Sequence, residues 1–315
     1  MRSRFLPFFL TLLLPWPLAA ANLYGLARGG TSYVAARDDG AAYRSGAGAT
    51  TWTVQDTGSS GALRGVAFLA GIFVAVGDGG RVVRSSDGGL GWSDETTPVN
   101  VTLRDAASHS TFLVAVGNGG TTLRRSSTTA VWDTTLSPGP AALHGVASNG
   151  TILVAVGDQG TVLRSTDQGL SWARQALAGA PALRGVCASG ATFIAVGLGG
   201  VIRRSTDSGL NWSPVTSPSG EDLFDIATDP GVFVAVGAQG TILRAAGSGA
   251  SGSWFEVPTP RAVTYRGVLF DGTQFLAVGD ADVVVRSIDG SLWQQVAITA
   301  VHWSDVKQLF RGSPR

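Results

Sequence analysis

Residues 143–172 read LHGVASNGTILVAVGDQGTVLRSTDQGLSW, and close copies of this stretch recur along the chain. Each copy ends in a tryptophan, and successive tryptophans are separated by 40, 40, 40, 40, 42 and 39 residues. A period of about 40 residues indicates one supersecondary unit that is repeated. The seven anchors are Trp52, Trp92, Trp132, Trp172, Trp212, Trp254 and Trp293.

Each unit predicts four short strands. Turns are expected at Asn149-Gly150 and at Gly157–Gly160, where glycine permits a positive φ. Short strands separated by turns at this spacing are typical of an antiparallel meander. In this unit the predicted strands are Leu143–Ala147, Ile152–Val156, Thr161–Ser165 and a fourth that opens at Trp172.

One such meander cannot bury both faces of its sheet, whereas seven arranged radially can. We therefore predict an all-β fold, a seven-bladed β-propeller with four antiparallel strands per blade. The apolar periodicity is two or continuous and never 3.6, which excludes a helical solenoid. The predicted propeller spans residues 22–297, with blades that start near residues 23, 63, 103, 143, 183, 223 and 265.

The two ends of the chain have other predicted roles. Residues 1–21 have the order of a secretory signal peptide, because Arg2 and Arg4 precede the apolar run Phe5–Leu14 and a small-residue cleavage site. Export to the periplasm or the extracellular space is therefore expected. Residues 298–315 form a C-terminal tail, in which Trp303–Lys307 competes with Leu23–Ala27 as the strand that closes the ring. The N-terminal strand fits the repeat better.

The composition of the chain limits the classes of partner that it is expected to bind. The 315 residues carry a net charge of +1, so neither nucleic-acid binding nor a basic membrane anchor is indicated. The three histidines lack metal-ligand spacing, and we predict no metal and no cofactor. Cys187 is the single cysteine and is expected to be a buried, inert thiol. We expect a monomer with no membrane span in its mature form.

A second motif precedes four of the tryptophans. Its pattern, S/T-x-D-x-G-x-x-W, resembles the Asp box of sialidase-like (BNR) propellers, in which an aspartate accepts backbone N–H groups across a turn. Three repeats lack the aspartate, which favours a structural role over catalysis or calcium binding. The motif residues are Asp87, Asp167, Asp207 and Asp289, with Trp92, Trp172, Trp212 and Trp293.

Two sets of arginines follow the repeat. The first precedes the motif at the end of every third strand and comprises Arg44, Arg84, Arg124, Arg164, Arg204, Arg244 and Arg286. The second lies on the first strands, which should line the central channel, and comprises Arg64, Arg104, Arg184 and Arg266, with His144 in the equivalent place. A structural interpretation pairs each third-strand arginine with an acid or a carbonyl. A functional interpretation makes both sets a basic surface for an acidic protein segment, with the channel set as the better candidate.

Signs of an enzyme are weak. The chain has only three glutamates, Glu95, Glu221 and Glu256, and no long loop to build a pocket. Asp105, Asp225 and Asp305 are candidate acids for a glycoside hydrolase, which needs two carboxylates. They occupy a slot that holds glycine in other repeats, so turn chemistry explains them equally well. We predict a non-enzymatic binding scaffold, with a carbohydrate-active propeller, either a lectin or a sialidase-like glycoside hydrolase, as the alternative.

The full repeat, L-R-G-V followed by F-V-A-V-G and then L-R-S-x-D-x-G-x-x-W, resembles the photosystem II stability/assembly factor family. The resemblance covers about residues 23–296 and carries over onto the third-strand arginines and the Asp-box residues. It implies exported seven-bladed propellers with an arginine-rich face that engage a protein client or a membrane-complex subunit. In an oxygenic phototroph it also implies the thylakoid lumen.

Overall fold

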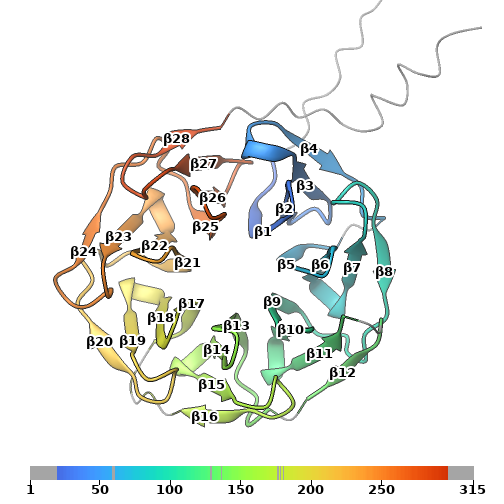
Figure 1. Ribbon diagram of the computed structural model, residues 1–315, viewed down its shortest axis with the longest axis horizontal. Helices are drawn as coiled ribbons and strands as arrows, with labels where there is room; N and C mark the ends of the chain where they lie inside the picture. Colours follow the sequence, from blue (N-terminus) through green and yellow to red (C-terminus); the bar gives the residue numbers. More distant parts are fainter. Residues whose placement is uncertain are drawn as a thin grey trace, which may run out of the picture.

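The protein is a ring of seven four-stranded antiparallel sheets around a central channel, which confirms the predicted seven-bladed propeller (Figure 1). The computed structural model describes residues 20–296, except residues 59–60, 128–129, 136, 176, 178 and 180. Most of the predicted signal peptide, the C-terminal tail and the candidate strand at 303–307 lie outside the described residues. No helix in the described part of the chain is long and apolar enough to cross a membrane.

Within each blade the strands run outward from the channel in chain order. The innermost strands are β1 (Leu23–Gly29), β5 (Leu63–Leu69), β9 (Leu103–His109), β13 (Leu143–Ser148), β17 (Leu183–Ser189), β21 (Leu223–Thr228) and β25 (Tyr265–Phe270). The second strands are β2 (Ser32–Arg37), β6 (Ile72–Gly77), β10 (Phe112–Gly117), β14 (Leu153–Gly157), β18 (Thr192–Gly197), β22 (Val232–Gly237) and β26 (Phe275–Gly279).

The outer half of each blade is shorter. The third strands are β3 (Ala42–Ser45), β7 (Val82–Ser85), β11 (Thr122–Ser126), β15 (Val162–Ser165), β19 (Ile202–Ser205), β23 (Ile242–Ala246) and β27 (Val284–Ser287). The outermost are β4 (Trp52–Gln55), β8 (Ser93–Glu95), β12 (Trp132–Thr134), β16 (Ala173–Gln175), β20 (Ser213–Val215), β24 (Trp254–Glu256) and β28 (Gln294–Gln295). Short 3₁₀ turns occur at η1 (Ala47–Ala49), η2 (Asp78–Gly80), η3 (Asn118–Gly120), η4 (Asp158–Gly160), η5 (Leu198–Gly200) and η6 (Ala238–Gly240).

The core lies between the blades. Seven apolar clusters each combine residues of two neighbouring blades, and every seam of the ring has one. Val34 of the first blade, for example, packs with Leu63 and Phe73 of the second. Each such buried side chain stabilises the fold by roughly 1.5–3 kcal/mol. A blade therefore depends on its neighbours for both faces of its sheet.

The inner strands come unusually close together. A Cβ atom on Gly65 of β5 would lie 2.6 Å from the Cα atom of Asp105 in β9. A Cβ on Gly185 of β17 would lie equally close to the Cα of Asp225 in β21, at 2.6 Å. Glycine at these positions lets neighbouring inner strands approach and sets the narrow width of the channel.

Polar contacts between blade one and blade seven add to the apolar cluster that closes the ring. The backbone N–H of Asp282 donates to the carbonyl oxygen of Ala21 at 2.8 Å. The fully buried Arg37 contacts Asp282 at 2.9 Å and Asp39 at 2.7 Å. Arg37 stands where the other second strands end in glycine, so this irregular copy of the repeat is the part that closes the ring.

Candidate binding site at the channel mouth

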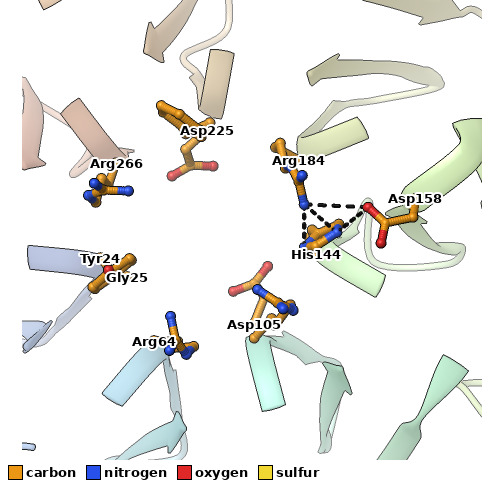
Figure 2. A pocket seen from close by; sticks show the side chains of 12 residues that line it. Tyr24, Gly25, Arg64, Asp105, His144, Asp158, Arg184, Asp225 and Arg266 are labelled. Carbon is orange, nitrogen blue, oxygen red and sulfur yellow. Dashed lines mark hydrogen bonds and ion pairs between the residues drawn. The ribbon is translucent and has the colours of Figure 1, made fainter. Parts of the chain in front are cut away.

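A cavity of about 470 Å³ opens at the end of the channel where the inner strands begin. Its wall is made by the second residue of each inner strand, because the seven blades present that position to the axis. We call these seven residues the mouth ring (Figure 2). They are Tyr24, Arg64, Arg104, His144, Arg184, Phe224 and Arg266. The four arginines expected to line the channel therefore meet in one cavity.

Two of these arginines are neutralised within their own blade. Arg64 donates from Nε and Nη2 to the carboxylate of Asp78 at 2.7 and 3.0 Å. That bidentate contact raises the pKa of Arg64 and lowers the pKa of Asp78. Arg266 pairs with Asp280 in the same way. The ring of Tyr24 lies between the two guanidinium groups, with centroid distances of 5.5 and 5.1 Å.

Among the described residues of its own blade, Arg104 has no carboxylate partner. Its Nε donates to the side-chain oxygen of Asn118 at 2.8 Å, a neutral acceptor that leaves the charge in place. Burial lowers the pKa of Arg104, and the positive charges of Arg64 and Arg184 act in the same direction. The mouth ring therefore carries a surplus of positive charge beside Arg104.

Arg184 likewise has no carboxylate partner in the described part of its own blade, where Leu198 takes the position of the acid. It reaches instead to His144 and to Asp158 of the preceding blade, 3.5 Å from its Nη1 (Figure 2). The Nε2 of His144 lies 2.7 Å from Asp158 Oδ1. Burial lowers the pKa of His144 to about 4, with Arg184 and Arg104 adding to the effect. His144 is therefore neutral at pH 7, and Asp158 faces the single charge of Arg184.

Two aspartates complete the wall at the next position along the strands. Asp105 accepts the backbone N–H of Ala106 at 2.8 Å and that of Val146 in the next blade at 2.9 Å. Asp225 makes the equivalent bond across its seam to Val268 at 2.8 Å. Burial raises the pKa of both carboxyl groups to about 7. Figure 2 shows both pointing into the cavity.

The third-strand arginines lie elsewhere. Val74 pairs with both Ala67 and Arg84, so Arg84 is level with a residue three positions beyond Arg64. Three residues of strand correspond to about 10 Å, and Arg84 is also two strands further from the axis. None of this set lines the cavity. The structure therefore does not join the two arginine sets into one basic face.

Most of the third-strand arginines contact the following blade. In five of them the Nε donates to a backbone carbonyl oxygen in the loop before the next tryptophan strand, at 2.7–3.0 Å. Arg84 differs and lies 3.6 Å from Glu95. Arg286 occupies the equivalent register position in β27, opposite Leu276. The five contacts are Arg44–Gly88, Arg124–Gln168, Arg164–Ser208, Arg204–Ser248 and Arg244–Asp289.

Each motif aspartate accepts hydrogen bonds from donors in its own loop. Asp207 accepts the N–H groups of Leu210 and Asn211 and the hydroxyl of Ser205, and these bonds lower its pKa to about 2. Asp87, Asp167 and Asp289 make corresponding bonds. In two of the three repeats without the aspartate, the indole N–H of Trp52 and Trp254 still donates to a loop carbonyl, and in the third the indole N–H of Trp132 donates to Glu95. In the described residues no cluster of His, Cys, Asp and Glu could hold a metal ion.

Sequence reasoning missed several residues of the site. The acids Asp78, Asp158 and Asp280 each follow a mouth-ring residue by 14 positions, a spacing that identifies them once the ring is known. Tyr24 and Phe224 stand in the arginine column and give the cavity an aromatic side. Asp105 and Asp225, weighed only as catalytic acids or turn residues, bridge neighbouring blades.

Comparisons with known proteins agree on the fold. No protein-family model matches the sequence, and no curated protein matches it. The solved structure "YCF48 bound to D1 peptide" has a TM-score of 0.70 at 16% identity, over 86% of this chain and 92% of that one. YCF48 from Cyanidioschyzon merolae has a TM-score of 0.67 at 15% identity, over 86% and 96%. The computationally designed Ika8 protein has 0.63 at 12%, over 85% and 96%.

Proposed function

We propose that this chain is a non-enzymatic, exported binding propeller that captures a carboxylate-bearing segment of a protein partner at the mouth ring. The observation that carries the proposal is the pair Arg104 and Arg184. Both line the cavity. Among the described residues Arg104 has no ion-pair partner, and Arg184 is paired with Asp158 of the preceding blade, 3.5 Å away. Guanidinium groups in a half-enclosed cavity bind carboxylates through charge-assisted hydrogen bonds.

A separate observation supports a protein as the partner. YCF48, a photosystem II assembly factor, shares this fold and has been solved with a D1 peptide bound. The repeat independently resembles the same assembly-factor family. We therefore propose an assembly role in which the client is a protein or a subunit of a membrane complex. The predicted signal peptide supports export to the periplasm, the extracellular space or, in an oxygenic phototroph, the thylakoid lumen.

The test uses a blocked hexapeptide, Gly-Asp-Ser-Ser-Ser-Gly, and its Asp-to-Asn counterpart, titrated into the protein by calorimetry. We expect the acidic peptide alone to bind, and its affinity to fall as salt is raised. The double variant R104Q/R184Q should lose at least about tenfold in affinity, because each charge-assisted bond contributes about 1.5–3 kcal/mol.

The matched control is R174Q/R203Q, which removes two arginines from outside the cavity. It should bind the acidic peptide as the unmodified protein does. All three proteins should melt at nearly the same temperature. Equal binding of the Asp and Asn peptides, or unchanged binding by R104Q/R184Q, would refute the proposed function. Specific binding and turnover of a glycan would instead favour a carbohydrate-active propeller.

A further inference from the structure

A second cavity, of about 320 Å³, lies further along the same channel. Apolar side chains make most of its wall, among them Leu26, Val66, Phe68, Leu269 and Phe270. No acidic residue lines it in the described part of the chain. Arg28, the cation among the described residues that line it, already donates to the backbone oxygens of Asp271 and Gly30. We call this space the apolar cavity.

The two cavities are built on the same strands. β1, β5, β9 and β25 supply the mouth ring with their second residues and the apolar cavity with residues two to four positions further on. At about 3.3 Å per residue, the two sites lie roughly 7–13 Å apart along the channel wall. That separation corresponds to two to four residues of an extended peptide.

Asp105 stands between the two sites, since it follows Arg104 of the mouth ring and precedes Ala106 of the apolar cavity. Its two carboxyl oxygens accept one backbone N–H each. A carboxyl group has more acceptor lone pairs than these two bonds use, whether it is ionised or protonated, so Asp105 keeps capacity for a further N–H group. Asp225 has the same spare capacity on the other side of the channel. An extended peptide offers such N–H groups at regular intervals.

From these three observations we infer that the partner segment enters the channel end-on, with a carboxylate at Arg104 and Arg184 and a bulky apolar side chain in the apolar cavity. The inference rests on the proposed function and specifies its partner: an acidic residue followed about three residues away by a large apolar one. The positive charges of Arg104 and Arg184 place the acidic residue of the peptide at the mouth ring. The position of both cavities on β1, β5, β9 and β25 places the apolar end.

The experiment compares the hexapeptide Gly-Asp-Ser-Ser-Leu-Gly with Gly-Asp-Ser-Ser-Ser-Gly by calorimetry. Burial of a leucine side chain should make the first bind at least about tenfold more tightly. The variant S108W places a large ring at an exposed residue that lines the apolar cavity. It should remove the advantage of the leucine peptide while leaving the affinity for the serine peptide unchanged. T111W, in the adjacent hairpin and outside both cavities, is the matched control.

The two proposals fail separately. Suppose that both peptides bind the unmodified protein equally well, bind R104Q/R184Q more weakly and bind S108W with unchanged affinity. The end-on inference is then wrong and the proposed function stands. If the leucine peptide binds more tightly than the serine peptide but has the same affinity for R104Q/R184Q as for the unmodified protein, the acidic end is not at the mouth ring and both proposals are wrong. If neither peptide binds, both are also wrong. If T111W still binds the leucine peptide more tightly than the serine peptide and S108W binds the two equally, the inference is supported.

Discussion

The Nε of Arg244 donates to the backbone carbonyl oxygen of Asp289, 2.8 Å away in the loop of the following blade. The contact joins the third strand of one blade to the tryptophan loop of the next, across a seam whose core is an apolar cluster. It uses a backbone oxygen, so it does not depend on which side chain the loop carries. Five of the seven third-strand arginines make this contact, among them Arg44, Arg124 and Arg244, whose own repeats lack the motif aspartate.

Arg204 provides the test of this role. R204Q removes the bond to the Ser248 carbonyl and should lower the free energy of unfolding by about 1–2 kcal/mol. Urea denaturation measures the change. R203Q, the adjacent residue on the same strand, should cost less than half as much. Equal costs would mean that Arg204 has no special role at the seam, and loss of peptide binding in R204Q would mean that its role is not purely structural.

The closure of the ring should be more sensitive than any other seam. D282N leaves the fully buried Arg37 with Asp39 alone. Breaking a buried ion pair by removing one partner costs about 3–5 kcal/mol, and guanidinium denaturation should show a loss of that size. D133N, at an exposed site, should change stability by under about 0.5 kcal/mol. Similar small losses in both variants would contradict the role assigned to Arg37.

Stability should depend on pH through Asp105 and Asp225. Burial raises their pKa to about 7 in the folded protein, against an ordinary aspartate pKa of 3.8. Between these values the folded state binds more protons than the unfolded state, so the free energy of unfolding falls as pH rises from about 4 to about 7. Melting temperatures in buffers of equal ionic strength measure the slope. D105N/D225N should flatten it, and an unchanged slope would show that these groups do not cause it.

Removal of divalent metal should leave the protein unaffected. The oxygens of Asp207 are occupied by N–H and hydroxyl donors of its own loop. A carboxylate satisfied in this way is a turn element and does not need a cation. The melting temperature in excess EDTA should match that in buffer with calcium. A fall of several degrees on chelation would assign the loop a metal.

The fold follows from the sequence because the repeat is long, regular and rich in turn signals. The β-branched run at 152–156 predicts its strand to within one residue of β14. The tryptophan stands one residue before β16, at the entry to the outer strand. These elements depend on local pattern, and seven copies make each one easier to recognise.

The site is harder to predict because its chemistry depends on contacts between repeats. The column that holds Arg104 and Arg184 is visible in the sequence. The absence of a paired carboxylate within their own blades depends on Asn118 and Leu198, 14 residues further on. The bond from Val146 to Asp105 crosses a seam, and nothing local predicts it. The repeat period identifies which positions are equivalent. The charge of the cavity depends on which residue each repeat carries at those positions.

The most direct measurement is a crystal structure of the protein with Gly-Asp-Ser-Ser-Leu-Gly bound. We predict that the peptide carboxylate lies within hydrogen-bond distance of Arg104 and Arg184 and that the leucine lies in the apolar cavity against Phe68. A peptide bound on the outer loops around Asp207, or one that leaves the channel mouth empty, would contradict the account.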